Sequence, residues 1–403
     1  MINSALPNIP PARGMRDLLP DEMRAFRRVE DAFRAATQRW GYQEIRTPTV
    51  ESYSLFSAAG ALPPQMLSRV YSFLDWDGWS GERIVLRPDS TIPVARAAAN
   101  AGLSLPARLF YVQSVMRFSS EEREGEDWQY GVEYLDAPAA IGDLEVVAVA
   151  CETLDALGIE PEVRLAHVGL SRAVVDALGP LGESESRHLL ENVTAEGLNA
   201  LRSAAAGHPA ASAFLAAALG PSGSITLLDN LTALTRTGLP GAQQPLAELR
   251  DVATALQNAG RGVHIDLGMA RDFEYYTGVV FDVVSGDDGW GSGGRYSPNV
   301  PGAATSACGL GLEATKLIDH VTGSTRKRTV VSVVPASEAL LSEAMKVARA
   351  LHKNGISASL ATSESEYTIA VVVSESGLRA HTPDGEQDMS SLDDVVGLLL
   401  RYK

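Results

Sequence analysis

Apolar residues recur every three to four positions between residues 21 and 40, which predicts an amphipathic helix. Its apolar face consists of Met23, Phe26, Val29, Phe33 and Ala36. Asp17 or Pro20 marks the expected start of this helix and Gly41 its expected end. Residues 142–158 return to the same spacing and predict a second helix.

β-branched and aromatic residues are concentrated in shorter segments that predict strands. In the first half of the chain these segments are Val70–Leu74, Arg83–Arg87, Arg108–Arg117, Gln129–Asp136 and Glu162–Val168. Strands are expected again at Val263–Leu267 and Tyr275–Ser285. The glycines between Gly286 and Gly294 then predict a tight turn, and residues 310–320 predict a helix.

Three regions differ from this pattern. Residues 171–260 are rich in alanine and leucine at helical spacing, and the polar segment 322–328 has the composition of a linker. Residues 329–403 predict a small α/β domain. Its expected strands are 330–334, 356–361 and 368–374, and its expected helices are 337–354 and 391–401.

The predicted elements indicate an α+β protein. Mostly antiparallel strands flanked by helices form a core from residues 1–170 and 261–321, and a helical insertion, 171–260, interrupts that core. A linker, 322–328, leads to the small α/β domain at 329–403. The pattern alone predicts no function.

Composition narrows the class of protein. Of the 403 residues, 45% are hydrophobic and 21% are charged, as in an ordinary soluble protein. The formal net charge of −16 disfavours partners rich in phosphate, so we expect neither nucleic acid nor anionic membranes as partners. Cys151 and Cys308 lie far apart, without the spacing of a metal site. With no secretory pattern in Met1–Pro11 and no run of ~20 apolar residues, we expect a cytoplasmic protein without metal or cofactor.

One predicted strand carries polar groups suited to a ligand. Alternation along Gln129–Asp136 places Gln129, Gly131 and Glu133 on one face and the neighbouring aromatic and aliphatic residues on the other. A carboxylate and an amide therefore share a face beside a glycine that leaves room. A carboxylate such as Glu133 accepts a hydrogen bond from an imidazole N–H.

Other polar residues complete the chemistry of such a ligand. Arg271 is a planar, bidentate donor for a ligand carboxylate, and Asp89, Thr91 and Gln129 offer acceptors to an ammonium group. Together these groups suit free histidine. Simpler interpretations stay open: Glu133 on a solvated strand face, Arg271 in a surface ion pair, and Tyr275 and Tyr276 in a strand core on propensity alone.

A series of short motifs resembles the class II aminoacyl-tRNA synthetase core in its histidyl form, from about Gly14 to Asp319. The motifs are Gly14–Pro20, Arg46–Pro48, Leu86–Thr91, Gly131–Glu133, Arg271–Gly278, Gly293–Tyr296 and Gly309–Glu313. The resemblance implies an antiparallel class II sheet flanked by helices, a homodimer formed through the core, and a C-terminal domain like a reduced anticodon-binding domain.

The same resemblance implies roles for single residues. It assigns the ligand's imidazole to Glu133 and Tyr276, its carboxylate to Arg271, and its amino group to Asp89, Thr91 and Gln129. Tyr296 is expected to line the same pocket, and Tyr275 belongs to the predicted histidine-binding set.

The resemblance fails where a synthetase activates its amino acid with ATP. Arg117 matches the first of two phosphate-binding arginines, but Ala314 occupies the position of the second. Loss of one such group costs on the order of 10²–10³ in rate. Lys316 lies two residues further on and is expected to point elsewhere on its helix. Asp127 falls where an aromatic ring would stack on adenine.

Charge departs from the synthetase pattern as well. The segment Ser119–Asp127 holds five acids and one arginine, and residues 329–403 hold ten acids and six lysines or arginines. The stretch Ala361–Tyr367 between two expected strands is short and acidic. Basic residues would be needed at these places to contact ATP or tRNA. We therefore expect no catalytic residues and no binding of nucleic acid.

These departures resemble the regulatory subunits of ATP phosphoribosyltransferase, a histidyl-tRNA synthetase paralogue family. The segments Leu86–Arg96, Gly142–Val147 and His167–Gly169 also resemble that family. The resemblance implies a short-form catalytic subunit as partner in a larger hetero-oligomer, and feedback inhibition by bound histidine in histidine biosynthesis. Two alternatives remain: an active histidyl-tRNA synthetase, and a histidine-binding paralogue with another partner.

Overall fold

The chain forms two compact units, Met1–Gly323 and Ser324–Lys403, each with its own hydrophobic core. The structure, a computed structural model, describes residues 9–58, 67–76, 81–118, 125–220, 223–236, 238–269, 276–322, 329–362 and 368–402. Within the described residues, no helix is both long and apolar enough to cross a membrane.

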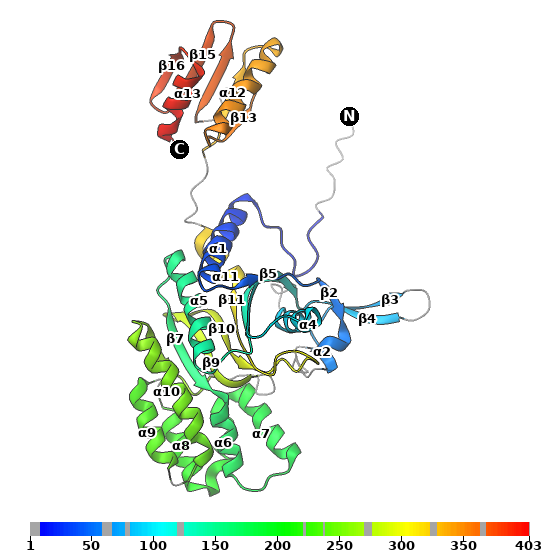
Figure 1. The fold of residues 1–403 in the computed structure, drawn as a ribbon, viewed down its shortest axis with the longest axis vertical. Coiled ribbons are helices and arrows are strands. Elements are labelled where there is room, and N and C mark those ends of the chain that lie inside the picture. Colours follow the sequence, from blue (N-terminus) through cyan, green and yellow to red (C-terminus); the bar gives the residue numbers. More distant parts are fainter. Residues whose placement is uncertain are drawn as a thin grey trace. The chain divides into compact units, whose positions relative to one another are not determined.

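An eight-stranded sheet forms the centre of the first unit (Figure 1). In sheet order its strands are β1 (Gln43–Glu44), β5 (Ala107–Met116), β6 (Glu126–Leu135), β11 (Ala307–Glu313), β10 (Asp288–Tyr296), β9 (Tyr276–Ser285), β7 (Glu162–His167) and β8 (Gly262–Ile265). The outer pairs β1–β5 and β7–β8 are parallel, and the pairs between them are antiparallel. This order places β6 beside β11, so that residues distant in sequence share one surface.

Three helices cover one face of this sheet: α1 (Pro20–Arg39), α5 (Ile141–Leu157) and α11 (Ala314–Thr322). Helix α1 starts at Pro20, and the Glu22 carboxylate accepts the Leu19 N–H at 3.0 Å. The apolar face of α1 packs Phe26 and Phe33 against Tyr130 of β6. Because side chains alternate along a strand, this packing turns the odd-numbered residues of β6 to the opposite face.

Helix α4 (Thr91–Ala101) covers part of that opposite face. Its residues Val94 and Ala98 pack with Tyr111, Leu135 and Tyr296. The sequence pattern did not predict this helix. It is buried around much of its circumference, so it lacks the polar stripe that reveals an amphipathic helix.

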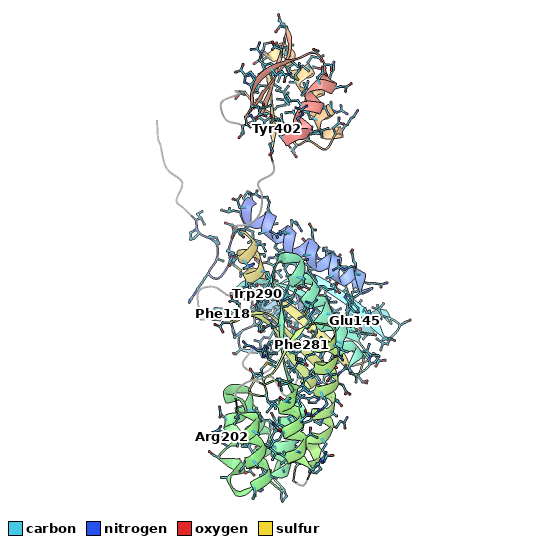
Figure 2. The ribbon with its side chains drawn as sticks, turned by 90° about the vertical axis from the view of Figure 1, so that its left-hand side faces the viewer. Phe118, Glu145, Arg202, Phe281, Trp290 and Tyr402 are labelled. Atoms are coloured by element: carbon cyan, nitrogen blue, oxygen red, sulfur yellow. The ribbon has the colours of Figure 1, made fainter. Side chains whose placement is uncertain are left out.

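Helices fill the chain between the parallel neighbours β7 and β8, as the composition predicts. They are α6 (Val168–Ala177), α7 (Glu183–Glu196), α8 (Pro209–Ala218), α9 (Ile225–Thr235) and α10 (Gln243–Asn258). They gather at one end of the unit, drawn in green in Figure 1. Arg202 lies among them, whereas Phe281 of β9 lies within the sheet (Figure 2).

Hydrogen bonds of one histidine connect this helical segment to the sheet. His167 ends β7, and its Nδ1 accepts the Gly169 N–H at the start of α6, at 3.0 Å. Its Nε2 lies 3.0 Å from Glu248 Oε2 in α10. Since Nδ1 accepts, Nε2 carries the proton and donates it to Glu248.

A smaller sheet and one short helix lie beside the large sheet. Its strands, in order, are β2 (Val50–Ser52), β4 (Gly81–Leu86) and β3 (Ser72–Trp76), and α2 (Tyr53–Ala58) follows β2. Strand β4 leads directly into Arg87 and the segment before α4.

The second unit is a five-stranded sheet with helices. Its strands, in order, are β13 (Ala358–Leu360), β12 (Val331–Pro335), β14 (Ala370–Ser374), β15 (Gly377–Thr382) and β16 (Gly385–Met389), and its helices are α12 (Leu341–Lys353) and α13 (Leu392–Leu399). The hairpin β15–β16 was not predicted, because polar side chains interrupt its apolar pattern and only Ala380 of the two strands is buried. This unit also has short 3₁₀ helices at Glu338–Leu340 and Leu400–Tyr402, and the first unit has others at Gly197–Leu201, Ala204–Gly207 and Pro240–Ala242.

The prediction of a glycine-rich turn from Gly286 to Gly294 is wrong. The turn is confined to the start of this segment, where Gly286 has φ +60°, and strand β10 begins at Asp288. A Cβ on Gly293 would lie 2.1 Å from the Gly309 carbonyl oxygen. These glycines therefore permit close packing between strands rather than turning the chain. The helix expected at 310–320 begins at Ala314, because β11 occupies the residues before it.

Candidate functional site

Glu133 lies at the centre of a buried polar cluster on the α4 side of the sheet. Its side chain is 1% exposed. Glu133 Oε2 accepts the Tyr296 hydroxyl at 2.6 Å, and Oε1 accepts the Tyr111 hydroxyl at 3.2 Å. Three strands, β5, β6 and β10, thus direct polar side chains to one point.

Two glycines make room for this cluster. A Cβ on Gly131 would lie 2.2 Å from Cζ of Tyr111, and a Cβ on Gly309 would lie 2.2 Å from Glu133 Oε2. Gly131 faces Tyr111 across β5–β6, and Gly309 faces Glu133 across β6–β11. The ring and the carboxyl group occupy the space that a side chain would need at either position.

Burial controls the charge of the cluster. It raises the pKa of Glu133 to about 8, against the lowering effect of hydrogen bonds from Tyr296, Thr91 and Tyr111. The negative charge of Asp89 raises this pKa further. The carboxyl group is therefore largely protonated at neutral pH, and it can share one proton with a neutral imidazole ring.

The residues expected to meet an amino group lie where α4 begins. Asp89 Oδ1 accepts the Thr91 N–H at 2.9 Å and the Ile92 N–H at 3.4 Å, in the first turn of the helix. Gln129 Oε1 accepts the Ser90 N–H at 3.3 Å. The structure therefore brings Asp89, Thr91 and Gln129 to the same end of β6 and α4.

The structure describes two of the three tyrosines predicted for the site. Tyr296 is fully buried, and Tyr276, its cross-strand neighbour, packs half-buried against the same apolar cluster. Arg271 and Tyr275 lie outside the described residues. Tyr111 was missed by the sequence analysis. Its period-2 placement on β5 put it on the correct face, but only the pairing with Gly131 reveals its proximity to Glu133.

The position expected for the second phosphate-binding arginine carries an uncharged side chain, Ala314. Ala314 is completely buried at the start of α11. Asp127 Oδ1 accepts the Thr315 hydroxyl at 2.5 Å and the Trp128 N–H at 2.8 Å, so this side chain is fixed against α11. Arg117, the remnant expected at the position of the first phosphate-binding arginine, donates from Nε to the Pro88 carbonyl at 2.7 Å.

Lys316 points elsewhere, as its place on the helix predicts. Its ammonium group pairs with Asp288 at 2.8 Å and donates to the Gly289 carbonyl at 3.1 Å. It also lies 5.0 Å from the ring centroid of Trp290, a residue labelled in Figure 2. These contacts hold Lys316, the one lysine of α11, at the Asp288 end of β10, which is the end opposite to Tyr296.

Comparison with known proteins assigns this architecture to a family. The family model described as Histidyl-tRNA synthetase matches residues 14–317. An ATP phosphoribosyltransferase regulatory subunit of Dehalococcoides mccartyi is 36% identical over 358 residues, which is 86% of this chain and 86% of that protein. The chain belongs to the histidyl-tRNA synthetase family, among the ATP phosphoribosyltransferase regulatory subunits.

Solved structures resemble this regulatory-subunit fold along most of its length. A Bacillus halodurans protein described as an ATP phosphoribosyltransferase regulatory subunit/histidyl-tRNA synthetase matches with TM-score 0.77 and 26% identity, over 88% of this chain and 93% of that chain. Histidyl-tRNA synthetase from Nostoc sp. PCC 7120 shares the fold with TM-score 0.78 at 20% identity, over 99% of this chain and 100% of that chain. The predicted α+β, class II synthetase-like fold is confirmed.

Proposed function

We propose that this regulatory subunit binds free histidine in the Glu133 cluster and transmits that signal to a short-form ATP phosphoribosyltransferase catalytic subunit. The catalytic subunit would need this partner for activity, and bound histidine would inhibit the complex. Regulation of this kind requires that histidine bind the active and inhibited complexes with different affinity.

The buried carboxyl group of Glu133 carries the proposal. A carboxyl group inside an apolar sheet face is costly unless it has partners. Tyr111 and Tyr296 satisfy it within the protein, and a ligand imidazole would offer it one N–H donor and one acceptor nitrogen. Asp89, Thr91 and Gln129 are suited to the ligand's amino group, and Arg271 to its carboxylate.

The same site supports the proposal that the protein has no catalytic activity of its own. Ala314 supplies no charge to a phosphate, and Lys316 is held by Asp288. Asp127, expected where an aromatic ring would stack on adenine, offers a carboxylate that is held by Thr315 and has no ring to stack. The protein therefore keeps the amino-acid half of a synthetase site without the groups that would activate the amino acid.

Assembly and location are part of the proposal. We expect a cytoplasmic homodimer formed through the core, within a larger hetero-oligomer with the catalytic subunit. The same proposal divides the chain into a synthetase-like core (1–170 with 261–321), a helical insertion (171–260), a linker (322–328) and a small α/β domain (329–403). The acidic composition of residues 329–403 supports a role other than tRNA binding.

The direct test is the rate of a short-form catalytic subunit with and without this protein, titrated with histidine. We expect activation by the protein and inhibition by histidine. Absence of any complex or rate change, with histidine still bound, would favour a histidine-binding paralogue with another partner. Histidine-dependent exchange between ATP and pyrophosphate would instead establish an active histidyl-tRNA synthetase.

A further inference from the structure

Arg87 is a buried arginine that the proposed histidine site does not use directly. It follows β4 and is 2% exposed. Burial lowers its pKa, while the charges of Glu51 and Asp89 act in the opposite direction. A guanidinium group in such a place needs a defined set of acceptors, because an uncompensated buried charge strongly destabilises a fold.

Backbone carbonyls supply most of those acceptors. Nη1 of Arg87 donates to the carbonyls of Thr47 at 2.9 Å and Pro48 at 2.8 Å, and Nη2 donates to the Ser114 carbonyl at 2.6 Å. The planar fork of one guanidinium thus spans two separate chain segments.

The backbone of Arg87 binds the same two segments. Its N–H donates to the Thr49 carbonyl at 2.8 Å, and its carbonyl accepts the Met116 N–H at 2.8 Å. Gln113 strengthens the junction, because its Oε1 accepts the Thr47 N–H at 3.0 Å. Residues 47–49, 87 and 113–116 therefore form one hydrogen-bonded junction.

The segment that follows Arg87 enters the proposed site within two to four residues. Asp89 and Thr91 are expected to meet the ligand's amino group, and Thr91 also contributes a hydrogen bond to Glu133. Arg117 also donates to the Pro88 carbonyl. The hydrogen bonds that hold Arg87 in the junction therefore also set the positions of Asp89 and Thr91.

We propose that Arg87 is a positioning residue: it fixes Asp89 and Thr91 for histidine and couples their placement to the segment Thr47–Thr49. This inference rests on the proposed function and names a route by which the site communicates with another part of the chain. Residues 47–49 lead directly into β2, at the edge of the small sheet. Histidine binding would order both ends of the junction.

The test compares two arginine-to-lysine variants. Lysine keeps the charge but cannot span three carbonyls with one planar fork. Arg87→Lys is expected to weaken histidine binding by about ten- to hundredfold, the equivalent of one lost charge-assisted hydrogen bond to the ligand. Calorimetric titration measures this affinity, and thermal denaturation measures stability in the same samples.

Arg108→Lys is the matched control. Arg108 forms a bidentate pair with Glu145 at 2.6 and 3.0 Å, on the face that packs against α5 and away from Glu133. Its partner Glu145 is labelled in Figure 2. Replacement of Arg108 should lower the melting temperature without changing histidine affinity. If Arg87→Lys lowers only the melting temperature and binds histidine like the wild type, Arg87 is purely structural and the proposal is wrong.

A measurement on the wild type keeps the test decisive if Arg87→Lys does not fold. Histidine should slow amide hydrogen exchange in peptides covering residues 46–50 as well as 87–92. Protection confined to 87–92 would contradict the coupling. A wild-type protein that binds no histidine would overturn the proposed function and this inference together, whereas histidine binding without protection at 46–50 overturns the inference alone.

Discussion

At the scale of single residues, the proposed site depends on the carboxyl group of Glu133, whose pKa burial raises to about 8. Alternation along β6 predicted from sequence that Glu133 shares a face with Gln129 and Gly131. The partners Tyr111 and Tyr296 come from other strands, so their convergence depends on strand pairing that a single sequence does not reveal. For the same reason the sequence could not show that Arg87 spans three carbonyls.

The pKa of Glu133 predicts how histidine affinity varies with pH. Between about pH 6.5, where a free imidazole titrates, and about 8, where Glu133 titrates, the complex forms without net proton exchange. Above that range the site must take up a proton, and below it the imidazolium ligand must release one, so affinity falls on both sides. Titration calorimetry across pH measures the profile. Glu133→Gln should weaken binding and lose the alkaline limb; an unchanged limb would assign it to another group.

Gly309 offers a second test of the site. A Cβ there would collide with Glu133 Oε2 at 2.2 Å, so Gly309→Ala should displace the carboxyl group and weaken histidine binding by tenfold or more, about the worth of one hydrogen bond to a charged group. Gly311→Ala is the control, because a Cβ at Gly311 meets nothing within 4 Å on the same strand. Equal histidine affinity in the two variants would show that Glu133 does not contact the ligand.

At the scale of elements, apolar spacing predicted helix α1 and several strands of the large sheet. The helix expected at 21–40 is α1, and the strands rich in β-branched residues lie close to their predicted limits. Strand β10 was missed because its glycines favour turns locally, and only the close approach of β11 explains them. Hairpin β15–β16 was missed because its solvated side chains carry little apolar pattern.

The His167 contact predicts how strongly the helical segment is attached to the sheet. His167→Ala removes the cap of α6 and the hydrogen bond to Glu248, and should lower the free energy of unfolding by about 2–3 kcal/mol. His167→Asn keeps a capping acceptor and should lose less. Chemical denaturation measures both variants. Equal losses in the two would mean that the cap contributes nothing.

The same residue predicts a pH dependence of stability. Burial lowers the pKa of His167, although Glu248 opposes this effect. The unfolded chain therefore takes up the proton first, so this residue's contribution to stability is complete above about pH 6.5 and is lost as pH falls below it. Denaturation midpoints of wild type and His167→Asn should converge at low pH. A constant difference between them would exclude this titration.

At the scale of the whole molecule, the two units have separate cores, and the described residues of the proposed site all belong to the first. A chain ending at Gly323 should therefore fold and bind histidine with unchanged affinity. Calorimetry measures that affinity, and the activation assay with the catalytic subunit then shows whether residues 324–403 serve the partner. Loss of histidine binding in a folded, truncated chain would mean that the second unit contributes to the site.

The parallel pairing of β7 with β8 has a further consequence. The chain leaves the sheet at His167 and returns at Gly262, in strands that lie side by side, with Glu162 opposite Gly262. A strand rises about 3.3 Å per residue, so the helical segment begins at one end of β7 and returns beside its other end, roughly 17 Å back along the strand. Parallel neighbours need a crossover connection of about a dozen residues or more, so a protein engineer could shorten this segment but could not replace it with a tight turn, because the chain has to travel back along β7 before β8 can begin.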